Sequence, residues 1–210
     1  MKKSFFALLL AAFLVTVTII VNEPPHVASK LAGNFFDASE LNKITIAFKK
    51  NFLKSSVNLN ISFQSQAPFG NWNMPYQEAC EEAALILAHY YYSGKHIDPQ
   101  TMQKEILSLV DWENKTFGYY KDTDSLEMAR TWKEYFGHRN VEPINNFTLE
   151  DLKYTLASGY PVIIPAAGRL LRNPYFTKPG PVFQHVLNAA HDFDSKNILN
   201  GHKIMIILRS

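Results

Sequence analysis

The chain has 210 residues, of which 47% are hydrophobic and 19% charged, and its formal net charge is +2. This length and composition are those of an ordinary globular protein with room for one domain and a real core. A net charge so close to zero gives no indication of nucleic-acid binding. The single cysteine excludes an internal disulfide framework.

The N-terminus predicts export. Met1-Lys2-Lys3 is followed by an uncharged apolar stretch from Ser4 to Val21, which is typical of a signal peptide or an N-terminal membrane anchor over residues 1–22. No small-residue cleavage site follows directly, which favours an uncleaved anchor with the two lysines in the cytoplasm. We therefore expect a membrane-anchored chain with an extracytoplasmic domain, or a secreted one. Residues 23–40 resemble a linker and residues 41–210 form the predicted domain.

Two elements are predicted in the first half of this domain. Apolar and polar residues alternate from Val57 to Phe63, which predicts a β-strand. A loop rich in Gly, Asn and Pro follows over residues 64–76. Good helix formers then predict a helix from about Cys80 to Ser93, closed by Gly94.

Capping patterns predict three further helices. They begin at Asp98-Pro99, at Asp124-Ser-Leu-Glu127 and at Thr148-Leu-Glu-Asp151. Short apolar segments predict strands at residues 161–165, 183–192 and 202–208. Because the helices come first and the strands later, we expect an α+β fold with a helical half packed on an antiparallel sheet.

Cys80 is the first candidate for chemistry. A cysteine in the first turn of a helix lies at the positive end of the helix dipole, which lowers its pKa and favours the reactive thiolate. Cys80 also shares one helical stripe with Ala84, Leu87 and Tyr91. The alternative interpretation is a small buried hydrophobic residue, which is the commonest role of a free cysteine.

A cysteine nucleophile needs a base. His185 lies on a predicted strand and is the preferred base, with His191 as the second choice. His89 lies two and a half turns along the Cys80 helix and points away from the thiol. The remaining histidines near element ends are expected to be solvated; they are His96, His138 and His202.

An oxyanion donor is the third requirement, and a glutamine side chain often supplies it. Gln64 and Gln66 lie in the loop before Cys80, and Gln66 is the preferred donor. No cofactor is expected, because the chain has no His-Glu-x-x-His motif and no cysteine pair. A competing metal cluster would need His185, His191, Asp192 and Asp194, whose spacing fits no known motif.

Two segments resemble the bacterial C39-like peptidase family, which are papain-like cysteine peptidases. The first reads Gln64-Ser-Gln66-Ala-Pro-Phe-Gly-Asn-Trp72-Asn-Met-Pro75-Tyr-Gln-Glu-Ala-Cys80-Glu-Glu-Ala. The second reads Pro165-Ala-Ala-Gly-Arg169-Leu-Leu-Arg-Asn173-Pro-Tyr-Phe-Thr-Lys-Pro-Gly-Pro181-Val-Phe. The resemblance spans about residues 60–195. It implies a papain-like fold, Cys80 as nucleophile, a histidine base and Gln66 as oxyanion donor.

The C-terminal part departs from the family. Ala190-His191-Asp192 stands where the family has Gly-Tyr-Asp, and Asn200-Gly201-His202 corresponds best to its Asn-Asp-Pro-Gly turn. Asn200 is therefore the candidate that orients the histidine, and the domain is altered or truncated here relative to the family.

Three functions remain open. The leading hypothesis is an extracytoplasmic cysteine peptidase acting on a peptide or protein through a thioester. The alternatives are an inactive papain-like module that binds peptides or cell-wall components, and an acyltransferase that uses the same Cys-His pair. The predicted partners are the peptide substrate and, through the N-terminal segment, the membrane; nucleic acid is not among them.

Overall fold

The computed structural model describes residues 57–166, 184–188 and 204–209. The helical elements are η1 (Pro68–Gly70), η2 (Tyr76–Glu78), α4 (Cys80–Ser93), α5 (Pro99–Thr116), α6 (Ser125–Glu134) and α7 (Leu149–Ala157). The strands are β1 (Asn140–Asn145), β2 (Val162–Ala166), β3 (Gln184–Asn188) and β4 (Ile204–Arg209). The predicted N-terminal anchor and linker lie outside the described residues, as does the predicted domain before residue 57.

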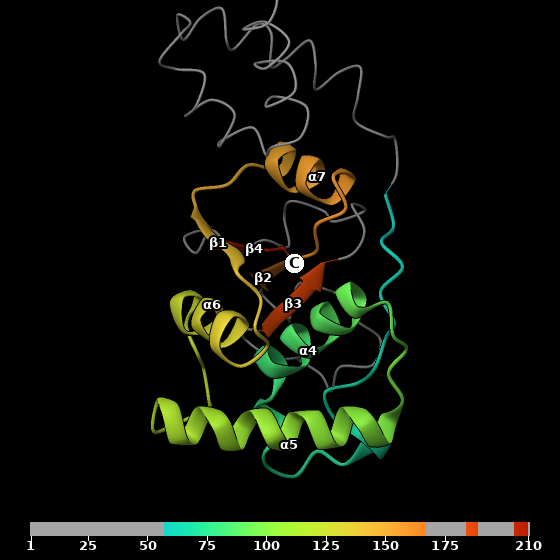
Figure 1. Cartoon of the computed structure of the whole chain (residues 1–210), viewed down its shortest axis with the longest axis vertical. Coiled ribbons are helices and arrows are strands. Elements are labelled where there is room, and N and C mark those ends of the chain that lie inside the picture. The colour runs from blue at the N-terminus through green and yellow to red at the C-terminus, as the bar shows by residue number, and fades with distance from the viewer. Residues whose placement is uncertain (1–56, 167–183, 189–203, 210) are drawn as a thin grey trace, which may run out of the picture.

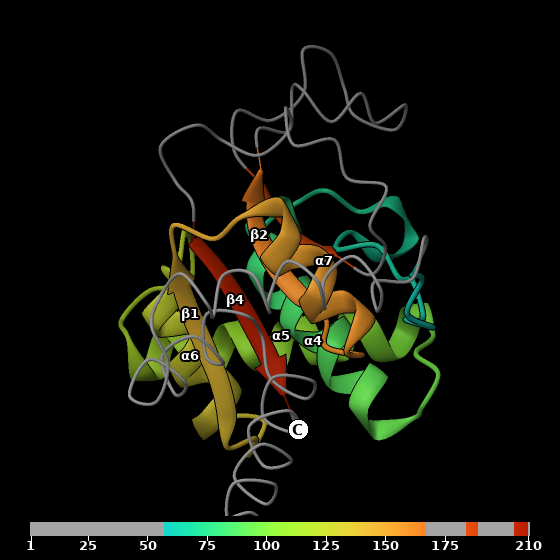
Figure 2. The ribbon, with the colours of Figure 1, turned by 90° about the horizontal axis from the view of Figure 1, so that it is seen from above.

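The four strands form one sheet in the order β1-β4-β2-β3, and every neighbouring pair is antiparallel. The predicted α+β class with an antiparallel sheet is therefore confirmed. Figure 2 shows β4 lying between β1 and β2, although it comes last of the described strands along the chain. Within the sheet, Ile163 of β2 is opposite Ile206 of β4, and Val162 is opposite Ile207.

Helices cover both faces of the sheet (Figure 1). Ile163 and Ile206 pack with Leu85 of α4 and Trp132 of α6. The alternate strand residues face the other way and pack against α7; this second layer contains Val162, Ile164, Ile207, Leu152 and Leu156. The alternation follows from the two-residue period of a strand, which sends neighbouring side chains to opposite faces.

The helix α5 lies across α4 on the side away from the sheet (Figure 1). Its apolar side is buried against α4 and the segment before it, and consists of Met102, Ile106, Leu109 and Val110. The helix α4 is therefore enclosed, with the sheet on one side and α5 on the other.

The predicted helix boundaries are confirmed where a cap was recognised. The Asp98 carboxylate accepts a hydrogen bond from the Thr101 backbone N–H at 2.8 Å. Asp124 and Thr148 each form a complete capping box. Gly94 ends α4 with a φ of 65°, in the left-handed region that favours glycine.

Two expectations need correction. The predicted strand over residues 57–63 is wrong, because only Asn58 forms an isolated bridge there. The Ile61 N–H bonds to the Leu59 carbonyl at 2.8 Å, a tight local turn that a continuous strand cannot contain. The strand β1 was not predicted. It contains Pro143, a residue that strands accept at the edge of a sheet, where β1 lies in the described strand order.

Candidate functional site

Cys80 is the first residue of α4, as predicted. The residue before it, Ala79, provides no side-chain cap, so the helix start has no carboxylate or hydroxyl from that position over its backbone N–H groups. The Cys80 side chain is half-buried. Its thiol donates a hydrogen bond to the Glu81 carboxylate, with 2.9 Å between Sγ and Oε2.

Gln66 lies against the same corner of the molecule. Its Nε2 donates to the Tyr76 carbonyl at 3.1 Å and to the Gln77 carbonyl at 3.4 Å, in the η2 turn that leads into Cys80. Gln64 instead donates to the Ile97 carbonyl, between α4 and α5. The structure therefore brings Gln66 to the start of α4 and directs Gln64 elsewhere. The Gln66 amide nitrogen therefore already donates to two backbone carbonyls.

The strand that carries His185 packs on α4. Figure 1 shows β3 running alongside α4, and His185 occupies the register position opposite Pro165 of β2. The structure describes the backbone of β3 but not its side chains. His191, Asn200 and the two aspartates of the competing metal cluster lie outside the described residues.

Two other histidines form a pair away from Cys80. His89 Nδ1 lies 2.9 Å from His138 Nε2. The His89 ring stacks on Phe136 at 4.8 Å, and the His138 ring stacks on Trp132 at 4.1 Å. His138 is therefore half-buried and bonded, which corrects the expectation that it is solvated. His96 is exposed, as expected, and its Nδ1 lies 2.7 Å from the Ser62 hydroxyl oxygen.

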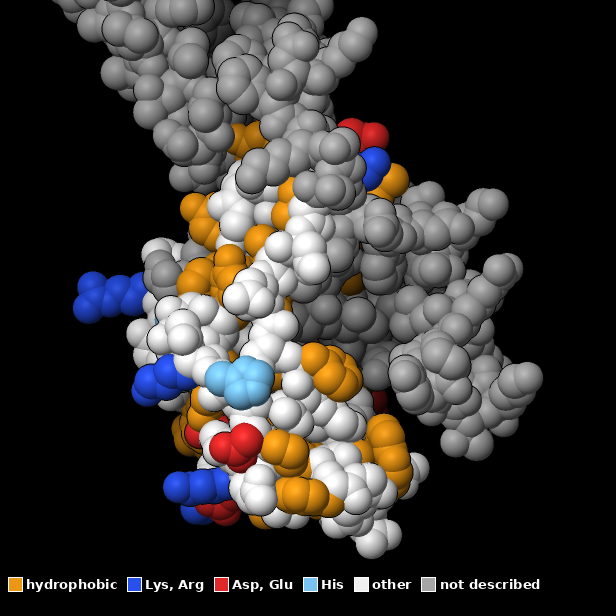
Figure 3. Space-filling model, turned by 90° about the vertical axis from the view of Figure 1, so that its right-hand side faces the viewer, with side chains coloured by type: hydrophobic (Ala, Val, Ile, Leu, Met, Phe, Trp, Pro, Cys, Tyr) orange, Lys and Arg blue, Asp and Glu red, His pale blue; other side chains and the backbone are white. Residues whose placement is uncertain are grey.

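The loop before Cys80 exposes large apolar side chains. Phe63 is 80% exposed, and Phe69, Trp72 and Met74 are more than half exposed. No charged residue occurs between residues 55 and 77. Figure 3 shows apolar side chains gathered on the lower part of the face to which this segment contributes. Such a surface, depleted of charge and rich in aromatic residues, has the composition of a binding interface.

The sequence analysis missed three buried glutamates. Glu81 and Glu82 in the first turn of α4, and Glu113 near the end of α5, are at most 2% exposed. The sequence does contain a signal that predicts the burial of Glu82. Residues 83–88 are apolar on every side of the helix, and a helix of this kind is buried. Burial raises the pKa of Glu113 to about 7. Burial, followed by the charge of Glu113, raises the pKa of Glu82 well above its ordinary value.

No protein family, curated protein or solved structure matches the chain. Among the described residues, no three His, Cys, Asp or Glu side chains gather closely enough to hold a metal ion. Over the same part of the chain, no helix has both the length and the apolar character needed to cross a bilayer.

Proposed function

We propose that the chain is a papain-like cysteine peptidase of the C39-like type, which acts on peptides outside the cytoplasm and is held there by its N-terminal segment. One observation carries the proposal. Cys80 is the first residue of an uncapped helix, and the Gln66 amide lies against the turn directly before it. A nucleophile and an amide donor at one helix start are two of the three groups that such a reaction needs.

The proposed reaction uses His185 as the third group. The Cys80 sulfur attacks the carbonyl carbon of the peptide bond, and the imidazole receives the thiol proton and passes it to the leaving amine. Water then hydrolyses the thioester, which releases the acid and restores the thiol. The Cys80 backbone N–H donates a hydrogen bond to the oxyanion. The Gln66 amide also donates to the oxyanion, after it releases one of its two backbone carbonyl acceptors. Asn200 orients His185 in this proposal.

The exposed loop suggests which peptides bind. Phe69, Trp72 and Met74 precede Cys80 in the same loop and expose an uncharged apolar surface. Peptides with large apolar side chains near the scissile bond fit such a surface best, because both surfaces lose water on contact.

The test compares the full chain with its Cys80→Ser variant on a panel of apolar and charged peptides. We expect hydrolysis of the apolar peptides by the wild type only, and alkylation of Cys80 by iodoacetamide at about pH 6 faster than that of a free thiol. His185→Ala should abolish this low-pH alkylation, whereas His191→Ala should not. A Cys80 that reacts only in denaturant contradicts the proposal.

A second candidate is a module that binds peptides without cleaving them. Two observations favour it. The thiol donates to the Glu81 carboxylate, whose negative charge opposes a thiolate, and the Gln66 amide nitrogen already donates to two backbone carbonyls. In this case, apolar peptides should change the fluorescence of the exposed Trp72 equally in the wild type and in Cys80→Ser. Glu81→Gln separates the two candidates, because only in the peptidase should it increase the rate of hydrolysis.

A further inference from the structure

Two glutamates from different helices meet in the interior. Glu82 belongs to the first turn of α4 and Glu113 to the last turns of α5, and neither side chain is exposed to solvent. None of their four carboxyl oxygens has a hydrogen-bond partner among the described residues. The Thr131 hydroxyl of α6, which is also fully buried and without a partner there, faces Glu113.

Two ionised carboxylates cannot share such a site. An unpaired buried charge is far more costly than a neutral buried carboxyl, and a second negative charge nearby increases the cost. One proton on the pair removes one charge and creates a donor, so that the protonated carboxyl can bond to the other. The Thr131 hydroxyl can then donate to a remaining oxygen.

We infer that Glu82 and Glu113 hold one proton between them at neutral pH, and that this shared proton keeps the start of α4 packed against α5 and α6. The site is separate from the proposed peptidase chemistry, since it needs neither His185 nor a substrate. The site is nevertheless close to Cys80 along the chain, because Glu82 is two residues after Cys80 in the same turn of α4.

The groups around the pair support a shared proton. Glu81 of α4 faces both glutamates, and Glu127 of α6 faces Glu113, so both add negative charge. Two phenols also face the pair: Tyr120, between α5 and α6, faces Glu82, and Tyr135, at the end of α6, faces Glu113. A phenol is neutral near pH 7 and does not replace the proton as a source of positive charge.

The consequence is a loss of stability at alkaline pH. The pKa values of both glutamates are raised in the folded protein, so above the ordinary glutamate pKa the folded chain binds more protons than the unfolded chain. The stability is complete below that ordinary value and is lost as pH rises through about 7 and beyond. For each proton held only by the folded state, the unfolding equilibrium constant grows about tenfold per pH unit.

The test measures thermal unfolding of the full chain in detergent between about pH 5 and about pH 9. Glu82→Gln imitates the protonated side chain, so its melting temperature should fall much less with pH than that of the wild type. Glu134→Gln is the matched control, because Glu134 is exposed on α6, and it should behave as the wild type. Carboxyl-carbon NMR of the wild type should show a glutamate that titrates near pH 7, which requires no variant to fold.

Two results would overturn the inference. One is a wild type whose melting temperature does not change between about pH 5 and about pH 8, with no glutamate titrating above about pH 6. The other is a melting temperature at alkaline pH that Ca²⁺ or Mg²⁺ raises in the wild type but not in Glu82→Gln. The ligand would then be a hard cation rather than a proton.

Discussion

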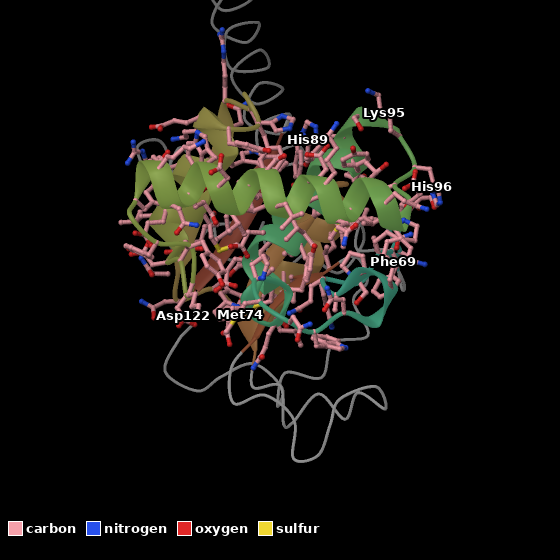
Figure 4. The ribbon with its side chains drawn as sticks, turned by 90° about the horizontal axis from the view of Figure 1, so that it is seen from below. Phe69, Met74, His89, Lys95, His96 and Asp122 are labelled. Atoms are coloured by element: carbon pink, nitrogen blue, oxygen red, sulfur yellow. The ribbon has the colours of Figure 1, made fainter. Side chains whose placement is uncertain are left out.

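The helix α4 contributes one member to each of two pairs of titratable side chains, and the pairs differ in burial and in hydrogen bonding. Glu82 meets Glu113 near the start of the helix, and His89 meets His138 in its second half. In the view of Figure 4, His89 and Met74 lie on opposite sides of the α5 ribbon. The Tyr120 hydroxyl bonds to the Met74 sulfur, and Tyr120 also faces Glu82.

The difference lies in how each pair is satisfied. The histidines are half-buried, hydrogen-bonded to each other and stacked on Trp132 and Phe136. These contacts satisfy both rings in the neutral form. The glutamates are fully buried and depend on a proton from solution. Burial therefore favours the neutral form in both places, but it weakens the fold in acid at the histidines and in alkali at the glutamates.

The largest effect is expected from removing the aromatic support of the histidine pair. Trp132 is fully buried and stacks on His138. Trp132→Ala should lower the free energy of unfolding by about 3–5 kcal/mol, the usual cost of truncating a buried tryptophan. Denaturant titration measures this, with Trp112→Ala as the control at a partly buried site. A smaller loss for Trp132→Ala than for the control would contradict the packing described.

Replacing both glutamates should have the opposite sign. Methionine is similar in length and apolar, so the double variant Glu82→Met with Glu113→Met fills the same space without a charge. We expect it to be more stable than the wild type at about pH 8, by about 1–4 kcal/mol, as found when buried charged groups are replaced by apolar ones. Denaturant titrations at about pH 6 and about pH 8 measure it, and a gain that does not grow with pH would argue against the shared proton.

A smaller effect is expected on the acid side. Burial lowers the pKa of both His89 and His138, so the unfolded chain takes up protons at a higher pH than the folded one. Stability is complete above the ordinary histidine pKa of about 6.5 and falls as pH decreases below it. His138→Phe keeps an aromatic ring on Trp132. In this variant, the melting temperature should decrease less between about pH 7 and about pH 5 than it does in the wild type. An equally steep decline in the variant would assign it to other groups.

The smallest effect is expected at an exposed ion pair. Lys115 and Asp111 are bonded on the solvent side of α5, and both are mostly exposed. Lys115→Ala should change the free energy of unfolding by no more than about 0.5 kcal/mol in the same titrations, because solvent screens such pairs. This variant sets the baseline for the buried pairs, and a larger loss would mean that α5 is held by its surface charges.

Local signals in the sequence predicted most of the helical half. The caps at Asp98, Asp124 and Thr148 act within one turn, so a short segment contains all the information that places them. Strand pairing is not local. Among the described residues, the alternating segment 57–63 forms one isolated bridge, at Asn58, and no strand. The strand β1 contains Pro143, which disfavours a strand in the sequence, and it pairs with β4, more than 50 residues later in the chain.

The site was predictable only in part, for the same reason. Cys80 and Gln66 were found because both belong to one loop and the helix start that it leads into. Their hydrogen bonds were not predicted. The Cys80 thiol bonds to Glu81 and the Gln66 amide bonds to η2 carbonyls, and the spacing of residues along the chain does not determine such contacts. The meeting of Glu82 with Glu113 joins residues from two helices and depends on the packing of the whole core. His185 and Asn200 remain predictions.

The position of β4 has a consequence for how the protein is made. The ribosome produces β1, β2 and β3 before β4, yet β4 is the strand that joins β1 to β2. Tyr92 of α4 also gives its hydroxyl hydrogen to the Leu208 carbonyl of β4. Until β4 is synthesised, β1 lacks the one partner strand that the described part of the chain provides, and the sheet face beneath Trp132 is incomplete. The nascent domain therefore exposes apolar surface until β4 leaves the exit tunnel, and this surface favours aggregation until then.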